Sequence, residues 1–197
     1  MPYPVTFEAD YADRRSRLTV FFRAILVIPL YLWLALYAIA ASIAIVVAWF
    51  VILVTARYPE DLYRFVSGYL RVLTLTTAYS ALLCDRYPPF APAPDDSYPV
   101  RMHFAGPLEH YSRLKTLLRV VLAIPIYVMR YAMNLVLELC SVVAWFVIVV
   151  LGRLPRGLFD TLMLVNSYIA RSDAYLFLLT ETYPPFQVEP PRAPGYA

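Results

Sequence analysis

Residues 24–56 read AILVIPLYLWLALYAIAASIAIVVAWFVILVTA, thirty-three positions without a charged side chain. An α-helix of that length would measure roughly 50 Å, whereas the hydrocarbon core of a bilayer is about 30 Å thick. One crossing would leave much of the stretch outside the hydrocarbon. The length therefore favours a hairpin of two crossings, and a hairpin that dips into the bilayer and returns without crossing it fully stays open.

The whole chain shares this apolar character. Its 197 residues are 61% hydrophobic and 16% charged, against about 45–50% and about 25% in ordinary soluble domains. This composition excludes a disordered chain, and it argues against a soluble globule because so small a body cannot bury so much apolar surface. The net charge of +3 is too small for a nucleic-acid-binding protein. We therefore expect a membrane protein whose first partner is the lipid bilayer, with no nucleic-acid partner.

The chain is a tandem repeat. Shifted by 96 positions, residues 14–90 match residues 110–186 without a gap and with 27 identities in 77 positions. The segment 46–52 returns unchanged as 142–148, and Tyr-Pro-Pro-Phe ends both copies. Because Arg, Pro and Trp match as well as the apolar residues, the similarity indicates a duplication.

The charges around the apolar stretch favour two crossings in each repeat. Arg23 precedes the stretch and Arg57 follows it, and a hairpin places both on the cytoplasmic side, as the positive-inside tendency prefers. In the second repeat Arg130 and Glu138 lie near the midpoint, where charges at a hairpin tip reach the outer interface. We therefore predict an all-α membrane protein with both termini in the cytoplasm and with crossings near residues 18–36, 39–56, 114–131 and 135–152.

An amphipathic helix is predicted after each hairpin, near residues 59–84 and 155–180. Polar side chains recur there at steps of three and four residues, which is the period of one helix face. Such helices suit the cytoplasmic membrane interface, with the apolar side in lipid or against the hairpin. Pro29 and Pro125, in the first helix of each hairpin, predict kinks, with a hinge or a cavity-lining break as the alternative.

The repeat also gives the domain boundaries. We expect a first repeat at residues 1–90, a Pro/Asp linker at 91–97, a second repeat at 98–186 and a Pro-rich tail at 187–197. Alternating apolar and polar residues near the start of both repeats, at 3–9 and 98–104, predict one short β-ribbon below the membrane.

No motif in the sequence indicates a catalytic or metal site. The chain lacks a Gly-rich phosphate loop, a His-Glu-X-X-His or Cys-X-X-Cys pattern and a nucleophile elbow. Cys84 and Cys140 lie far apart, which argues against a disulfide framework. We therefore expect a protein that is not an enzyme and that uses no metal and no cofactor.

The candidate binding residues are charges that lie beside or within the apolar stretches. Contacts with lipid headgroups or a membrane partner are predicted for seven arginines, Arg23, Arg57, Arg64, Arg71, Arg119, Arg153 and Arg171. For Arg23 and Arg119 the carbonyls at a helix end are an equal option, and the wall of an internal vestibule is a further one. Arg130 and Glu138 are predicted to pair across the second hairpin tip, either snorkelling to headgroups or forming a substrate or ion site.

The landmarks that recur in both repeats resemble those of a known family. They are Arg-X-X-X-X-Ile-Pro, Ala-Trp-Phe, Arg-X-Pro and Tyr-Pro-Pro-Phe. Over nearly its whole length, and as two copies, the chain resembles a bacterial membrane family of unknown function numbered 4389. The second copy departs from the first in having Leu154 where the first has Tyr58, and in carrying Arg130 and Glu138. The resemblance implies an integral membrane protein and brings no catalytic residue.

Three classes of function fit these features. We favour a non-enzymatic scaffold or accessory subunit in the plasma (inner) membrane of a bacterium, which contacts lipid headgroups and either a membrane-protein partner or further copies of itself. The alternative is a small oligomeric transporter or channel subunit, because internal duplication is common in transporters. An enzyme acting on a lipid substrate is the third, and would show a deep interfacial cavity with converging polar side chains.

Overall fold

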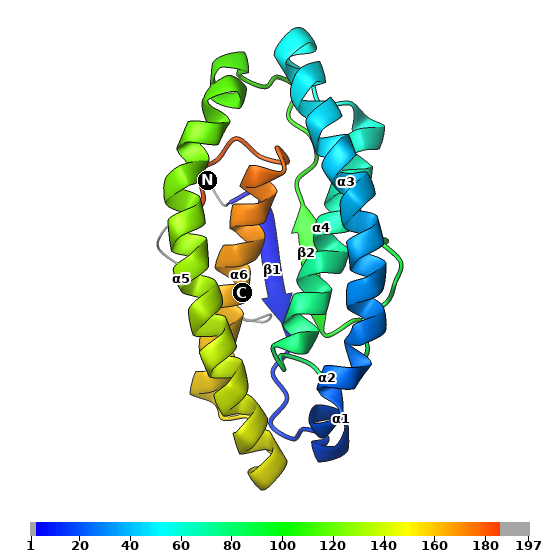
Figure 1. Ribbon diagram of the computed structural model, residues 1–197, viewed down its shortest axis with the longest axis vertical. Coiled ribbons are helices and arrows are strands. Elements are labelled where there is room, and N and C mark those ends of the chain that lie inside the picture. The colour runs from blue at the N-terminus through cyan, green and yellow to red at the C-terminus, as the bar shows by residue number, and fades with distance from the viewer. Residues whose placement is uncertain (1–2, 186–197) are drawn as a thin grey trace, which may run out of the picture.

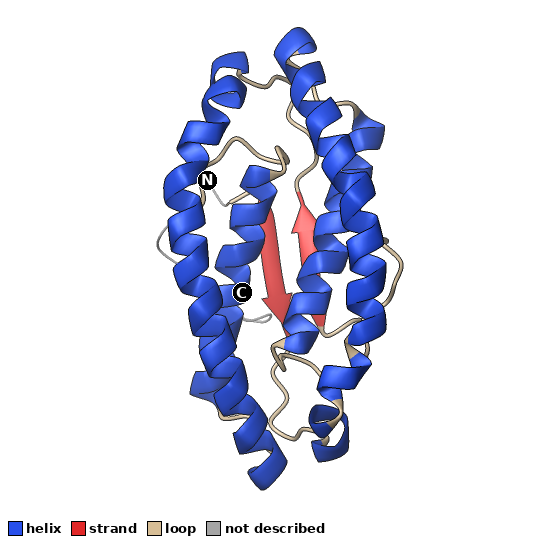
Figure 2. Ribbon diagram, viewed as in Figure 1, coloured by secondary structure: helices blue, strands red, loops and turns tan. Residues whose placement is uncertain are grey.

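The computed structural model describes residues 3–185 and is mainly α-helical, with one small sheet (Figures 1 and 2). The elements in chain order are β1 Val5–Ala9, α1 Arg17–Phe21, α2 Arg23–Leu26, α3 Ile28–Thr55, α4 Glu60–Ser80, β2 Val100–Phe104, α5 Arg113–Leu151 and α6 Arg156–Leu176. Strands β1 and β2 pair in antiparallel fashion with Phe7 opposite Met102. The predicted β-ribbon between the starts of the two repeats is therefore confirmed.

The elements are arranged in layers. Figure 1 shows α4 and α6 side by side at the centre, with α3 beside α4 and α5 beside α6. The sheet covers the far side of α4 and α6, and its inward side chains are buried against them. Helices α3 and α5 lie nearer the viewer and run in opposite directions along the long axis of the molecule.

An approximate two-fold axis relates the two repeats. Trp49 Nε1 donates a hydrogen bond to the Thr116 carbonyl at 3.0 Å, and Trp145 Nε1 donates to the Val20 carbonyl at 3.1 Å. Trp145 is the equivalent of Trp49 in the other repeat, and Val20 is the equivalent of Thr116. The two hydrogen bonds are therefore related by exchanging the repeats. The Phe7–Met102 pair lies at the centre of the two-stranded sheet, so the axis passes through the sheet and between α4 and α6.

The predicted hairpins are wrong. Tyr37 and Met133, at the predicted turns, lie inside the continuous helices α3 and α5. Residues 31–56 contain neither Gly nor Pro, so nothing breaks the helical hydrogen bonds there. The helices end instead at Ala56 and Gly152, which have left-handed φ values of 58° and 71°. Two long helices therefore replace the four crossings predicted at residues 18–36, 39–56, 114–131 and 135–152.

Helices α4 and α6 lie close to the bounds predicted for amphipathic helices, but their predicted surface position is wrong. Most of their residues are buried between the sheet and the long helices. In α4, Ser67 and Thr74 belong to the predicted polar stripe and are only 7% and 5% exposed. These two helices form the interior of the protein because α3, α5 and the sheet cover them.

The two prolines affect their helices differently. Pro29 lies in the first turn of α3, just after a break at Val27 that separates α3 from α2. Pro125 lies inside the continuous helix α5. Proline lacks a backbone donor at both positions, so the predicted interruption is present in the first repeat, whereas the helix assignment continues through Pro125 in the second.

Two segments are long and apolar enough to cross a membrane, Arg23–Thr55 and Arg113–Leu151. Both are mostly exposed, since only 22% and 17% of their most apolar windows are buried. In α3 the buried residues form one narrow stripe, made of Leu30, Leu34, Ala41, Ala44, Ala48 and Ile52. An apolar helix that leaves most of its circumference uncovered suits lipid better than water.

Candidate functional site

The most regular charged feature is a pair of buried arginines, one in each repeat. Arg23 and Arg119 are each 4% exposed. Arg23 donates to the carbonyl of Tyr79 at 2.6 Å and to that of Cys84 at 2.7 Å, at the C-terminal end of α4. Arg119 makes the equivalent hydrogen bonds at the end of α6. The helix-end option for these arginines is therefore confirmed, and their predicted contact with lipid headgroups is wrong because carbonyls left over at the helix ends occupy them.

An acidic residue lies near each of these arginine anchors, and in the first repeat it bonds the arginine directly. Asp85 accepts a hydrogen bond from Arg23 Nη2 at 2.9 Å and another from the Ser16 backbone N–H at 2.9 Å. Its equivalent, Glu181, accepts from the backbone N–H of Ser112. Each carboxylate thus joins the N-cap residue of α1 or α5 to the segment that follows α4 or α6. The arginine anchors therefore stabilise the fold of each repeat.

The other five arginines predicted to contact headgroups divide by exposure. Arg71 is half-buried and donates to the Pro92 carbonyl at 2.6 Å. The guanidinium of Arg171, also half-buried, lies 5.6 Å from the centre of the Tyr3 ring. Both side chains are used within the protein. The exposed members, which stay candidates for headgroup contact, are Arg57, Arg64 and Arg153.

Arg130 in α5 does not pair with Glu138, so that prediction is wrong. Its Nη1 lies 2.9 Å from Oδ1 of Asp173 in α6. Glu138 is exposed and lies eight residues further along the same helix, a rise of about 12 Å that puts it out of reach. The charged residues at the centre of the second repeat therefore do not mark a turn, and Arg130 makes an internal contact.

Arg130 and Asp173 line a small polar cavity where α4, α5 and α6 meet. The cavity has a volume of about 60 Å³, which is room for a few water molecules. Thr74, Thr77, Asn134 and Asn166 supply the rest of its polar lining.

Asp173 is the buried ionisable residue of this cavity that sequence reasoning missed. It is 1% exposed, and burial raises its pKa to about 7 although the Arg130 guanidinium acts to lower it. The carboxyl group therefore titrates near neutral pH inside the protein. The available signal was Arg130 itself, because a charge in the middle of an apolar helix requires a partner.

Two larger clefts lie in equivalent places on the two repeats. One, of about 320 Å³, lies between Arg23 and Trp145, and the other, of about 270 Å³, lies between Arg119 and Trp49. The remaining walls are mainly apolar side chains of the long helices. The buried arginine in each wall already binds helix-end carbonyls, so these clefts suit apolar chains better than polar substrates.

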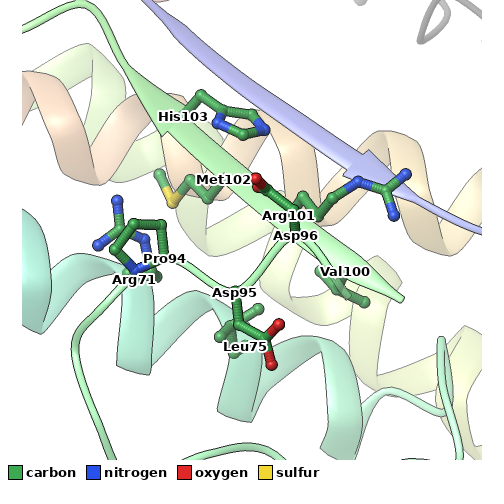
Figure 3. Close-up of a pocket in the computed structure, with 9 residues that line it drawn as sticks. All are labelled: Arg71, Leu75, Pro94, Asp95, Asp96, Val100, Arg101, Met102 and His103. Atoms are coloured by element: carbon green, nitrogen blue, oxygen red, sulfur yellow. The ribbon is translucent and has the colours of Figure 1, made fainter. Parts of the chain in front are cut away.

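A shallow pocket lies beside the sheet. Figure 3 shows it between α4, the 91–97 linker and β2, with Arg71, Asp95 and His103 among its lining residues. Its volume is about 10 Å³, enough for about one water molecule, so it cannot enclose a substrate. Within residues 3–185, no three His, Cys, Asp or Glu side chains gather in a way that could hold a metal ion.

Comparison with known proteins identifies the repeat and no activity. A family model described as "Domain of unknown function (DUF4389)" matches residues 17–91 and 113–187. No curated protein and no solved structure matches the chain. Each matched segment contains one long apolar helix and the short helix that follows it.

Proposed function

The chain belongs to the DUF4389 family as two tandem copies, and on that premise we propose that it is a non-enzymatic scaffold or accessory subunit embedded in a membrane. In this proposal α3 and α5 contact lipid, the exposed arginines contact headgroups, and the polar side of the molecule binds a membrane-protein partner or a second copy. The membrane is a bacterial plasma membrane, with both termini on the cytoplasmic side.

The observation that carries the proposal is the apolar surface of the two long helices. Within residues 3–185, the large apolar side chains that are exposed lie on segments 17–55 and 113–151, with the exceptions of Phe65, Tyr87, Phe90, Leu108 and Leu164. A water-soluble monomer rarely exposes a continuous apolar patch of this extent. Lipid acyl chains would cover it and leave few backbone groups unpaired, because nearly all of it is helical.

The outer face of the sheet supports the partner part of the proposal. Thr6 and His103 are exposed there, and Arg101 bonds both carboxylate oxygens of Asp10 at 2.8 Å. This face is polar and is held by the rigid helices beneath it. A rigid polar surface beside a membrane anchor is what an accessory subunit offers to a partner.

Site-specific crosslinking tests the proposal. The variants His103→Cys, on the sheet, and Ile39→Cys, on the exposed side of α3, are made with Cys84→Ser and Cys140→Ala and carry a photoreactive group in native membranes. We expect His103→Cys to crosslink one protein in stoichiometric amount, while Ile39→Cys crosslinks lipid. Extraction of the protein from membranes by alkaline carbonate would contradict the membrane assignment, and absence of any protein adduct at the sheet would contradict the scaffold role.

A transporter or channel subunit is the second candidate, favoured by the polar cavity around Arg130 and Asp173. Buried ionisable residues in membrane proteins often mark ion or proton pathways. Liposomes that contain the purified protein would then show proton or ion flux, and Asp173→Asn would reduce it at least tenfold. Glu138→Gln, on the exposed side of the same helix, is the matched variant. Liposomes without flux would eliminate this candidate.

A further inference from the structure

We infer that the protein lies flat in one leaflet of the bilayer, with α3 and α5 parallel to the membrane plane and the β1–β2 sheet facing water. The inference rests on the proposed membrane location and assigns an orientation to it. In this orientation the acyl chains of a single leaflet cover the apolar face of α3 and α5. The alternative is an upright molecule, in which α3 and α5 cross the bilayer in opposite directions.

The position of the sheet is the first argument for the flat orientation. The sheet lies at mid-height of the long axis, on the side away from α3 and α5 (Figure 1). Its outer face carries Glu8 and Arg101 in register, and Arg101 binds Asp10. An upright molecule would place these charges near the bilayer centre, where each costs at least about 2.5–3.5 kcal/mol. A flat molecule leaves them in water.

The lengths of the helices give a second argument. Helix α5 has 39 residues, so it is about 58 Å long, nearly twice the thickness of the hydrocarbon core. Its exposed large apolar residues extend from Leu114 to Leu151, together with exposed Arg113 and Lys115 in the first turn and exposed Glu138 further along. Upright, one or both ends would expose these side chains to water. Flat, the exposed apolar side chains along the whole helix lie in the hydrocarbon at one depth.

The two-fold axis gives the third argument. In an upright molecule the axis would lie in the membrane plane, so that the equivalent residues Arg57 and Arg153 would face opposite compartments. In a flat molecule the axis is parallel to the membrane normal, and both arginines lie at the same depth. Only the flat orientation keeps the basic residues of both repeats on one side, as the positive-inside tendency favours.

The flat orientation also bears on the second candidate function. A single copy that occupies one leaflet provides no path across the other leaflet. Transport through the Arg130–Asp173 cavity of one molecule is therefore incompatible with it, whereas a scaffold needs no such path.

Spin labels that report depth test the orientation. Leu32, Ile39 and Phe50 lie opposite the buried stripe of α3 and are 59–65% exposed, and their equivalents in α5 are Val128, Leu135 and Phe146. Each is changed to Cys in a Cys84→Ser, Cys140→Ala background, labelled with a nitroxide, and reconstituted in phosphatidylethanolamine–phosphatidylglycerol vesicles. Collisions with oxygen, which concentrates in lipid, and with a water-soluble nickel complex then give the depth. Thr6→Cys and His103→Cys are the matched labels on the sheet.

The two orientations give different depth profiles. We expect all six helix labels to fall within about 5 Å of one depth, one helical pitch, and both sheet labels to be freely accessible to nickel. An upright molecule would place Leu32 and Phe50 near opposite surfaces, because they are about 27 Å apart along the axis. Ile39 would then be about 10 Å deeper than Leu32, and the sheet labels would be shielded from nickel. That profile would overturn the flat orientation and leave the membrane proposal intact.

Two other outcomes would also overturn it. If nickel reached all eight labels, the protein would lie outside the bilayer, and the proposed membrane function would fail together with the orientation. If neither oxygen nor nickel reached the helix labels, protein rather than lipid would cover α3 and α5, and a second copy would be the occupant.

Discussion

The two repeats are nearly identical at the ends of their short helices and differ at the centre of their long ones. Arg23 and Arg119 make the same kind of contact with helix-end carbonyls. At the centre, the first repeat has Leu34 and Thr77 where the second has Arg130 and Asp173. The arginine anchors are therefore common to both repeats, whereas the Arg130–Asp173 pair belongs to the second repeat alone.

The Arg130–Asp173 pair at the centre of the second repeat is not an obvious source of stability. Replacing a buried ion pair by apolar residues is often neutral or stabilising by 1–4 kcal/mol. In the first repeat the equivalent positions hold Leu34 and Thr77, so the same architecture accepts uncharged residues there. The architecture therefore does not require the Arg130–Asp173 pair at this position.

Removing an arginine anchor should have the largest effect. We expect Arg23→Met and Arg119→Met each to lower the free energy of unfolding by about 3–5 kcal/mol, because helix-end carbonyls lose their buried donor and, at Arg23, the Asp85 carboxylate also loses its counter-ion. Unfolding in a detergent–denaturant titration, followed by tryptophan fluorescence, measures this. The two losses should agree within about 1 kcal/mol if the anchors are equivalent.

Arg57→Met is the control for the anchors, since Arg57 is exposed at the C-terminal end of α3. It should change stability by less than about 0.5 kcal/mol. A loss at Arg119 without a comparable loss at Arg23 would contradict the equivalence of the two repeats.

The pH dependence of the free energy of unfolding should distinguish the Arg130–Asp173 pair of the second repeat from Leu34 and Thr77 of the first. The pKa of Asp173 is about 7 in the folded protein and 3.8 as its ordinary value, so the folded state binds a proton that the unfolded state releases between these values. This carboxyl group therefore makes folding less favourable as the pH rises from 4 to 7, and no further above 7.

The variant that removes this pH dependence is Arg130→Leu/Asp173→Thr, which gives the second repeat the residues of the first. The difference in free energy of unfolding between this variant and the unmodified protein should change by up to about 4 kcal/mol in favour of the variant as the pH rises from 4 to 8. Denaturant titrations at both pH values measure the change. Parallel pH curves for the two proteins would show that Asp173 titrates normally.

The single variant Arg130→Leu should have a smaller effect that depends on pH. At pH 8 it leaves a buried carboxylate without its counter-ion and should cost about 1–3 kcal/mol. At pH 5 Asp173 is protonated and the cost should be smaller. Leu34→Met, at the position of the first repeat that is equivalent to Arg130, is the matched control and should show no such pH dependence. An equal loss at both pH values would mean that Arg130 acts through packing alone.

The sequence predicted the duplicated module, the apolar helices, the β-ribbon and the approximate bounds of the short helices, because each depends on periodicity or on residue identity within a segment. The predicted topology is wrong because Arg130 and Glu138, as charges in the middle of an apolar run, indicate a hairpin tip when the sequence is considered alone. Their actual environment depends on Asp173, about forty positions away, and on how α6 packs against α5. A contact of that range is set by tertiary packing, and a charge in an apolar run signals only that a partner exists.

The smallest predicted effect concerns the hydrogen bonds that join the two repeats. Trp49→Phe and Trp145→Phe each remove one indole donor, to the carbonyl of Thr116 or of Val20, and keep an aromatic ring in place. Each should cost about 0.5–1.5 kcal/mol, and the two costs should be equal and additive, because the bonds lie at opposite ends of the molecule. Phe50→Leu and Phe146→Leu, on the exposed side of the same helices, are the controls. Unequal tryptophan losses would mean that the asymmetry of the centres extends to the ends, and the two-fold relation would then describe the backbone but not its energetics.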